Sequence, residues 1–220
     1  MIINQQERDA VYKTIYQRRD TRSEFKPEPV PDDVLRRILD AAHHAPSVGF
    51  MQPWDFIIVR DKAVKQRIKE GFEQAHREAA LKFEGERREM YKTLKLEGIM
   101  EAPVGIAITC DRSRTGPAVI GRTANPEMDL YSSVCAVQNL WLAARAENIG
   151  VGWVSILHHA AFKKALGIPR DIMPVAYLCL GYVSHFHEKP ELEKAGWLER
   201  LPLDSLIHYD QWDSQMETVS

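Results

Sequence analysis

Hydrophobic residues in this chain follow two patterns, one with the period of a helix and one typical of buried strands. Apolar positions three or four residues apart predict amphipathic helices at residues 7–19, 31–42 and 159–166. Residues 62–100 are rich in charged side chains and have a helical pattern. We expect two or more helices there, with breaks near Gly71 or Gly85.

Short runs of aliphatic, β-branched and aromatic residues between turn signals predict strands. They cover residues 54–59, 103–110, 151–157 and 174–183. Strands and helices interleave, and no linker-like segment divides the 220 residues. The pattern therefore predicts one α+β domain.

The longest predicted helix, residues 127–148, is apolar on almost every side. Val134, Val137 and Trp141 share one stripe, other apolar residues widen it, and Gly150 is expected to end the helix. A helix of this kind must be buried on several sides. We therefore expect it to lie centrally and to be shared with a second subunit.

Composition narrows the function only by exclusion. A net charge of −2 gives no electrostatic footprint for nucleic acid or an anionic membrane. No apolar run reaches the roughly 18 residues of a membrane span, and the polar N-terminus does not resemble a signal peptide. Cys110, Cys135 and Cys179 lie in apolar surroundings without a Cys-x-x-Cys spacing, which favours free thiols and the cytoplasm.

The most distinctive charged motif is Arg18-Arg19-Asp20-Thr21-Arg22. Guanidinium groups match phosphate oxygens in bidentate geometry, so the cluster is a candidate phosphate clamp. Taken alone, the motif fits a solvated basic helix end better. The polar loop at residues 111–126 holds three further arginines and is long enough to be functional or mobile.

Other candidate sites are weaker. The adjacent pairs His43-His44 and His158-His159 diverge by about 100° on a helix and do not suit one metal. The segment His185-x-His187-Glu188 has chelating spacing, but no second cluster supplies further ligands, and we expect no metal. Gly150-x-Gly152 lacks the third glycine and preceding strand of a dinucleotide-binding fingerprint.

Three motifs taken together resemble the nitroreductase-like FMN-binding family. They are Arg18-Arg19-Asp20-x-Arg22, Ala45-Pro46-Ser47 followed by Gln52-Pro53-Trp54, and residues 150–157. The resemblance implies an α+β fold with a central mixed sheet flanked by helices. It also implies a homodimer that shares the long helix and builds two flavin sites between its subunits. One FMN-binding domain would cover residues 1–220, with terminal extensions that pack on the partner.

Three departures from ordinary members resemble one branch, the dimethylbenzimidazole synthases or flavin destructases. The chain has Asp20 in place of a serine, Phe50 in place of an asparagine, and Trp153-Val154-Ser155 where others have a Pro- and Glu/Gly-containing turn. That branch consumes reduced FMN and O2 and yields 5,6-dimethylbenzimidazole, the lower ligand of cobalamin, and erythrose 4-phosphate. FMNH2 is then a substrate that a separate flavin reductase supplies.

The resemblance implies a catalytic role for Asp20 and Ser155. The implied flavin-binding residues are Arg18, Arg19, Asp20, Thr21, Arg22, Ser47, Gly49, Phe50, Met51, Gln52, Leu96, Trp153, Val154, Ser155 and Arg200. A carboxylate is a suitable general acid or base for ring cleavage. An ordinary Asp20–arginine pair, a core hydroxyl at Ser155 and core packing of Phe50 and Met51 remain alternatives.

Two other functions stay open on the sequence alone. One is an NAD(P)H-dependent nitroreductase or FMN oxidoreductase that retains its FMN, and the other is a non-catalytic flavin-binding protein. Asp20, Phe50 and Ser155 favour flavin cleavage, because a nitroreductase site must admit a nicotinamide and then an acceptor.

Overall fold

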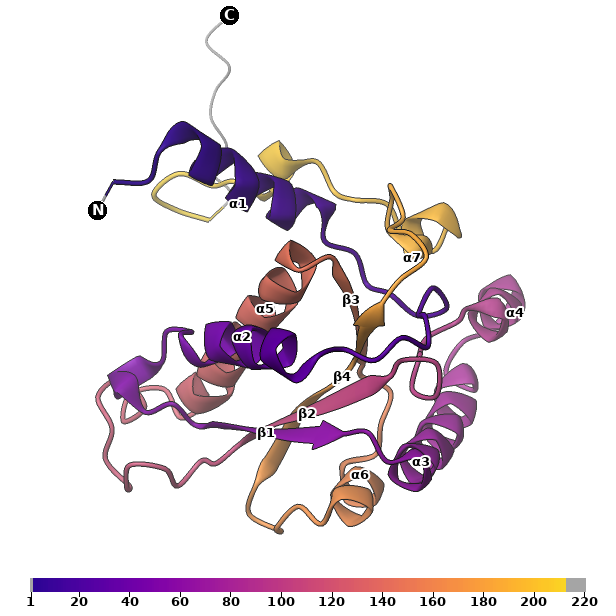
Figure 1. The fold of residues 1–220 in the computed structure, drawn as a ribbon, viewed down its shortest axis with the longest axis horizontal. Helices are drawn as coiled ribbons and strands as arrows, with labels where there is room; N and C mark the ends of the chain where they lie inside the picture. The colour runs from indigo at the N-terminus through magenta and orange to yellow at the C-terminus, as the bar shows by residue number, and fades with distance from the viewer. Residues whose placement is uncertain (1, 213–220) are drawn as a thin grey trace, which may run out of the picture. The chain divides into compact units, whose positions relative to one another are not determined.

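The computed structural model describes residues 2–212, and the chain forms two compact units, Met1–Glu188 and Lys189–Ser220. The first unit is built on a four-stranded sheet in the order β1-β2-β4-β3 (Figure 1). Its strands are β1 (Trp54–Val59), β2 (Val104–Cys110), β3 (Ile149–Val154) and β4 (Met173–Tyr182). All neighbouring strands pair antiparallel. The expected α+β architecture is confirmed, but parallel pairing is limited to an isolated bridge between Asp20 and Val151.

Helices cover both faces of the sheet (Figure 1). The helices α2 (Asp32–His43) and α5 (Met128–Ala146) pack on one face, while α3 (Lys62–Ala80) and α6 (His159–Leu166) pack on the other. All residues of β2 are buried; Ile106 and Ile108 belong to the α2/α5 core, and Ala107 belongs to the α3/α6 core. This alternation is the period of a strand whose two faces are both covered.

The long helix α5 is shorter at both ends than the sequence indicates. It ends at Ala146, and Asn148 has a left-handed φ of 57°, whereas Gly150 lies inside β3. The prediction that Gly150 ends the helix was therefore wrong. Val137 and Trp141 are buried, but Tyr131 and Val134 expose 54% and 42% of their surface. One apolar strip of α5 therefore has no cover within the described chain.

The N-terminal helix α1 (Gln5–Gln17) begins at a capping box in which Asn4 and Glu7 exchange hydrogen bonds. It buries no residue, although Val11, Tyr12, Ile15 and Tyr16 are spaced as an apolar face. These four side chains expose between 40% and 69% of their surface.

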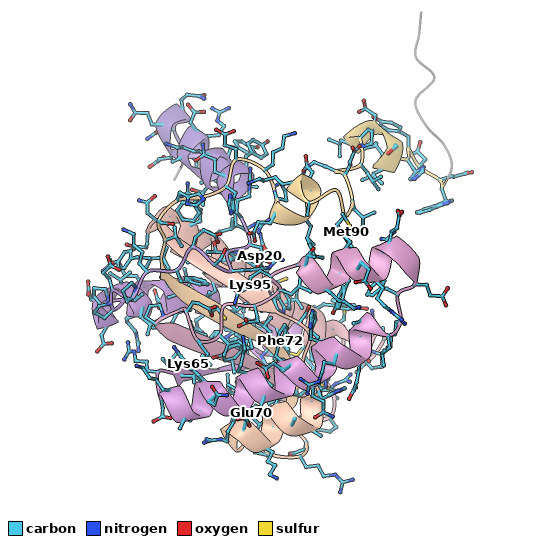
Figure 2. The ribbon with its side chains drawn as sticks, turned by 90° about the vertical axis from the view of Figure 1, so that its right-hand side faces the viewer. Asp20, Lys65, Glu70, Phe72, Met90 and Lys95 are labelled. Atoms are coloured by element: carbon cyan, nitrogen blue, oxygen red, sulfur yellow. The ribbon has the colours of Figure 1, made fainter. Side chains whose placement is uncertain are left out.

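The charge-rich region forms α3 and α4 (Gly85–Thr93). Helix α3 continues through Gly71, so of the two predicted breaks only the one near Gly85 is confirmed. A stack of aromatic rings joins the two helices: His76 lies between Phe72 of α3 and Tyr91 of α4, with centroid distances of 5.3 and 4.8 Å (Figure 2 labels Phe72).

The remaining predictions hold with small changes. The helix at 159–166 and the strand at 54–59 have the predicted bounds, but β3 ends at Val154 and leaves Ser155 outside the strand. Cys110 and Cys179 are buried and Cys135 is half-buried, and all three thiols are free. The second unit contains α7 (Glu191–Lys194) and the short 3-10 helix η2 (Leu203–Leu206). No helix within residues 2–212 is long and apolar enough to cross a membrane.

Candidate functional site

Asp20 lies along the outer edge of β3. The Trp153 backbone N–H donates a hydrogen bond to Asp20 Oδ1 at 2.9 Å, and the Thr21 N–H donates to the Val151 carbonyl at 3.0 Å. β3 is an edge strand, so these bonds satisfy groups that the sheet leaves unpaired. Asp20 is thereby fixed next to Trp153, two residues before Ser155, which follows the end of β3.

Two glycines explain why the chain passes so close to β3. A Cβ atom on Gly152 would lie 2.0 Å from the Thr21 carbonyl oxygen, and one on Gly150 would lie 3.0 Å from Thr21 Oγ1. Only a residue without a side chain permits this backbone approach. Gly150 and Gly152 thus bring Asp20 to the strand, a role unrelated to dinucleotide binding.

The Asp20 carboxylate lies between opposing electrostatic influences. Its side chain is 27% exposed, and burial raises its pKa above the usual value, while Arg22, the Trp153 N–H and Arg18 counteract that rise. Arg22 forms an ion pair with Asp20 Oδ2 at 2.5 Å. The result is a carboxyl group with increased proton affinity next to two cations, which is a suitable setting for proton transfer.

Ser155 follows the end of β3 and is exposed. Its carbonyl accepts a hydrogen bond from the Leu157 N–H at 3.1 Å, which turns the chain away from the sheet. A cavity of about 110 Å³ lies against Trp153, Val154 and Ser155. This cavity is smaller than the roughly 300 Å³ of ordinary ligand sites, so further residues are needed to enclose a flavin.

The arginines of the motif have different environments. The Arg18 guanidinium lies over the Trp141 ring at 4.7 Å from the centroid, whereas Arg19 donates to the carbonyl oxygens of Tyr16, Arg18 and Glu188. Arg19 therefore ties the end of α1 to residue 188. Arg18 and Arg22 are the members whose side chains flank Asp20 electrostatically.

The second predicted motif, residues 47–52, forms a strained loop around the 3-10 helix η1 (Val48–Phe50). Gly49, Phe50 and Gln52 have φ values of 60°, 52° and 45°. Left-handed conformations are costly for residues other than glycine and cluster at functional sites. Within this loop Met51 is buried, but Phe50 is 81% exposed, so only Met51 packs into the core.

Hydrogen bonds and close packing hold the loop in place. Ser47 Oγ accepts a bond from the Gln52 N–H, and Ser132 Oγ of α5 accepts one from the Val48 N–H, both at 3.1 Å. A Cβ on Gly49 would lie 2.4 Å from Val119 Cγ1. The loop is therefore anchored to the N-terminal half of α5.

The loop and Asp20 attach to different ends of α5. The Trp141 indole N–H donates to the Arg19 carbonyl at 3.3 Å, so the arginine motif is anchored at Trp141. Ser132 and Trp141 are nine residues apart, which corresponds to about 13.5 Å along a helix. The chain thus places Asp20, with Arg18 and Arg22 around it, against β3 at Trp153, but holds residues 47–52 at a separate anchor.

Gly98 packs against the arginine motif, and this contact brings the nearby Leu96 close to the motif. A Cβ on Gly98 would lie 2.5 Å from the Arg22 carbonyl oxygen. The buried carboxylate of Glu97 holds this segment: it pairs with Lys69 at 2.6 Å and Lys95 at 2.8 Å (Figure 2 labels Lys95 and Asp20). Leu96 itself is half-buried.

Sequence reasoning missed Glu97 and Gly98. Their signal, a carboxylate and a glycine between two apolar residues, is too weak to distinguish from an ordinary loop. Arg200, predicted to complete the phosphate clamp, lies in the second unit. A separate cavity of about 550 Å³ is lined by Arg112, Arg122 and Asp129, near the N-terminal end of α5.

Comparison with known proteins agrees with this fold. The profile of the nitroreductase family matches residues 15–182. The chain belongs to the nitroreductase family. Within it, the chain is 40% identical over 195 residues to a 5,6-dimethylbenzimidazole synthase of Rhodospirillum rubrum, covering 89% of this chain and 92% of the relative. It is 38% identical over 204 residues to a protein of the same name from Rhodobacter capsulatus, covering 93% and 98%.

A solved structure also matches in three dimensions. The crystal structure of oxidized iodotyrosine deiodinase bound to FMN and 3-iodo-L-tyrosine superposes with a TM-score of 0.72 and 22% identity, covering 92% of this chain and all of the other. At this identity the likeness establishes the fold, and nitroreductase-fold neighbours of this kind bind FMN.

Proposed function

We propose that this nitroreductase-family protein is a 5,6-dimethylbenzimidazole synthase, which cleaves reduced FMN with O2 to 5,6-dimethylbenzimidazole and erythrose 4-phosphate. The observation that carries the proposal is the position of the Asp20 carboxylate, which is fixed by the N–H of Trp153, two residues before Ser155. The relatives of that name, which match nearly the whole chain, support it.

The residues of the site fit a flavin at both of its ends. Arg18 and Arg22 supply charge-assisted hydrogen bonds for the terminal phosphate. Trp153, Val154 and Leu96 provide apolar contacts for the ring. Reduced FMN, when bound, supplies the electrons for O2 and the carbon skeleton of the products.

Asp20 and Ser155 then handle protons at the ring. Burial raises the pKa of Asp20, which favours a carboxyl group that accepts and returns protons during the reaction; such general acid–base catalysis is worth roughly 10²–10⁴ in rate. The Ser155 hydroxyl is placed to hydrogen-bond the ring nitrogen that holds or passes a proton. The exposed Phe50 side chain is placed to restrict the entry of water, whereas Met51 packs into the core.

A homodimer would complete this site. Residues 47–52 are anchored away from Asp20, Phe50 is exposed, and the α5 strip with Tyr131 and Val134 is uncovered in the described chain. If α5 packs against α5 of a second protomer, the loop of one protomer covers the flavin of the other. In this arrangement residues 1–220 form one FMN-binding domain whose terminal extensions pack on the partner.

The dimer is tested by Val134→Lys, which places a charge in the proposed interface. We expect sedimentation to show a monomer and FMN titration to show greatly weakened binding. Gln138→Lys, on an exposed position one turn further along α5, tests the extent of the same strip. A Val134→Lys protein that remains dimeric and binds FMN normally would remove α5 from the interface.

The activity is tested by mixing the protein with FMNH2 in air and separating the products by chromatography. Formation of 5,6-dimethylbenzimidazole supports the proposal. Consumption of NAD(P)H with a nitroaromatic acceptor would instead support a retained-FMN nitroreductase, and plain reoxidation to FMN would support a flavin-binding protein.

The source of reduced flavin needs its own experiment. We propose that a separate cytoplasmic flavin reductase supplies FMNH2, so NADH and FMN alone should give no product. Addition of a flavin reductase to that mixture should start product formation. Product formed from NADH and FMN without the reductase would show direct use of the nicotinamide.

A further inference from the structure

Two segments far apart in the sequence meet beyond the end of β4. Phe25 and Val183 form an antiparallel bridge, and the Ser184 N–H donates to the Glu24 carbonyl at 2.9 Å. The Lys26 N–H donates to the Tyr182 carbonyl at 2.8 Å. This pairing places Glu24 beside the segment that contains His185 and His187.

The side chains of Glu24, His185 and His187 converge. One ligand atom from each lies within 4.8 Å of the other two. His187 Nε2 lies 3.1 Å from Glu24 Oε1, although the residues are 163 positions apart. The two imidazole rings are perpendicular, with centroids 4.7 Å apart.

This spacing suits a small tetrahedral cation. Zn²⁺ binds imidazole nitrogen and carboxylate oxygen at about 2.0–2.2 Å, so two of its ligands lie roughly 3.3 Å apart. Glu24 and His187 already have nearly this separation. His185 is exposed, and rotation of its side chain closes the remaining gap.

Neighbouring groups orient these ligands. Ser23 Oγ and the Arg22 N–H donate to the two carboxylate oxygens of Glu24 at 2.6 and 3.2 Å. Ser184 Oγ lies 3.1 Å from His185 Nδ1. When Nδ1–H donates to that hydroxyl, the lone pair of Nε2 is available to a metal.

We propose that Glu24, His185 and His187 bind a divalent transition metal, with Zn²⁺ as the best match and water as the fourth ligand. Two imidazoles and one carboxylate favour Zn²⁺ over Ca²⁺ or Mg²⁺, which require mostly oxygen ligands. Sequence reasoning considered His185, His187 and Glu188, but found no further ligand. The fold supplies Glu24 as the third ligand. Glu188 is not part of this cluster, and its backbone carbonyl accepts a hydrogen bond from Arg19.

A bound metal would cross-link the residues after β4 to the segment that follows the arginine motif. This inference does not depend on the proposed function, because it concerns no flavin and no step of the reaction. It is therefore tested on the full chain without flavin, produced without a histidine tag.

The experiment titrates Co²⁺ into the protein and records its visible ligand-field bands, then displaces Co²⁺ with Zn²⁺ in the presence of a chromogenic chelator. We expect one equivalent of metal per chain and a rise in the thermal unfolding midpoint with Zn²⁺. His185→Ala and His187→Ala should each weaken binding by about tenfold or more. Ser184→Ala, which keeps all three ligands, should weaken it less.

His158→Ala is the matched control. His158 Nε2 pairs with Glu78 at 2.7 Å, so it forms a similar histidine–carboxylate contact without a second imidazole. This variant should bind like the wild type. The proposal is overturned if the wild type does not compete with the chelator, or if His185→Ala and His187→Ala, with normal circular dichroism, keep wild-type affinity.

Discussion

The outer edge of β3 and the loop at residues 47–52 are two parts of one proposed site with different completeness. At β3, backbone hydrogen bonds fix Asp20 and Thr21, and the Asp20 carboxylate accepts a bond from Trp153, two residues before Ser155. At the loop, the backbone is equally well anchored, but Phe50 projects outward with 81% of its surface exposed. Asp20 and Thr21 make their contacts within the chain, whereas the Phe50 side chain of the loop is left exposed by the described chain.

This difference indicates how the protein divides its tasks. Under the proposed function, groups that transfer protons must be placed accurately, and a strand edge would place Asp20 here. Groups that cover a ligand need only a surface, and a second protomer can supply it. Substitutions that affect one region and spare the other test this division.

The largest effect is expected for Asp20→Asn. The amide keeps the shape of the side chain and can still accept the Trp153 N–H bond, but it cannot transfer a proton. Product formation from FMNH2 should fall by about 10²–10⁴-fold, while FMN affinity should stay near normal. Chromatography and a flavin titration measure the two quantities.

Asp33→Asn is the control for this substitution, because Asp33 also pairs with an arginine, Arg37, but on an exposed helix surface. It should leave both quantities unchanged. Normal product formation by Asp20→Asn would show that Asp20 only shapes the turn.

Arg22→Ala should affect both binding and proton affinity. Loss of the guanidinium should weaken FMN binding by about 1.5–3 kcal/mol, the range for hydrogen bonds to charged groups. Burial raises the pKa of Asp20 and Arg22 lowers it, so removal of Arg22 raises that pKa further. If ionised Asp20 is the base, the acidic limb of the pH–rate profile should move to higher pH.

Two results would separate these roles of Arg22. An unchanged affinity by titration would remove Arg22 from the phosphate clamp, and an unchanged acidic limb would show that the ion pair does not tune Asp20. Arg37→Ala, which removes an exposed arginine from the Asp33 pair, should alter neither quantity.

Gly152→Ala should separate Asp20 from β3. Its Cβ would lie 2.0 Å from the Thr21 carbonyl oxygen, so the segment at residues 20–21 must move. Overpacking of this kind costs about 1–3 kcal/mol of unfolding free energy. Urea unfolding measures this loss, and product formation should fall with it.

Gly71→Ala provides the comparison, because its Cβ would meet only Ala161 Cβ at an ordinary 3.7 Å inside α3. An alanine in a helix interior should be neutral or stabilising by up to about 1 kcal/mol. Equal stabilities for the two variants would mean that the approach of Thr21 to β3 is loose.

Much of the fold was predictable because local patterns determine it. The aromatic and β-branched content of residues 54–59 and the helix predicted at 159–166 gave bounds that agree with β1 and α6. The end of β3 before Ser155 and the continuation of α3 through Gly71 depend on packing that a single segment does not reveal. Propensity alone misplaces such ends, because tertiary contacts override it.

The residues of the proposed site come from the sequence, but their contacts could not be predicted from it. The arginine motif and the Ser47–Gln52 box were recognised from a family pattern, whereas the Asp20–Trp153 bond joins residues 133 positions apart. The contact between Glu24 and His187 joins residues still further apart in the sequence, 163 positions. Hydrogen bonds between residues so far apart in the sequence depend on which strands pair. The local spacing of hydrophobic residues does not determine that pairing.

The smallest effect is expected for Gly49→Ala, which disturbs the loop alone. Gly49 has a φ of 60°, and a left-handed alanine costs about 1–2 kcal/mol. Its Cβ would also lie 2.4 Å from Val119 Cγ1, so the loop must shift. Gly167→Ala imposes a similar φ, 66°, with nothing within 4 Å of its Cβ, and so isolates the conformational cost. Gly49→Ala should lose more stability in urea than Gly167→Ala, because the Val119 clash adds to the same conformational cost. Only Gly49→Ala should weaken FMN binding, and it should leave the pH dependence set by Asp20 unchanged. If Gly167→Ala weakens FMN binding equally, the loop has no particular part in holding the flavin.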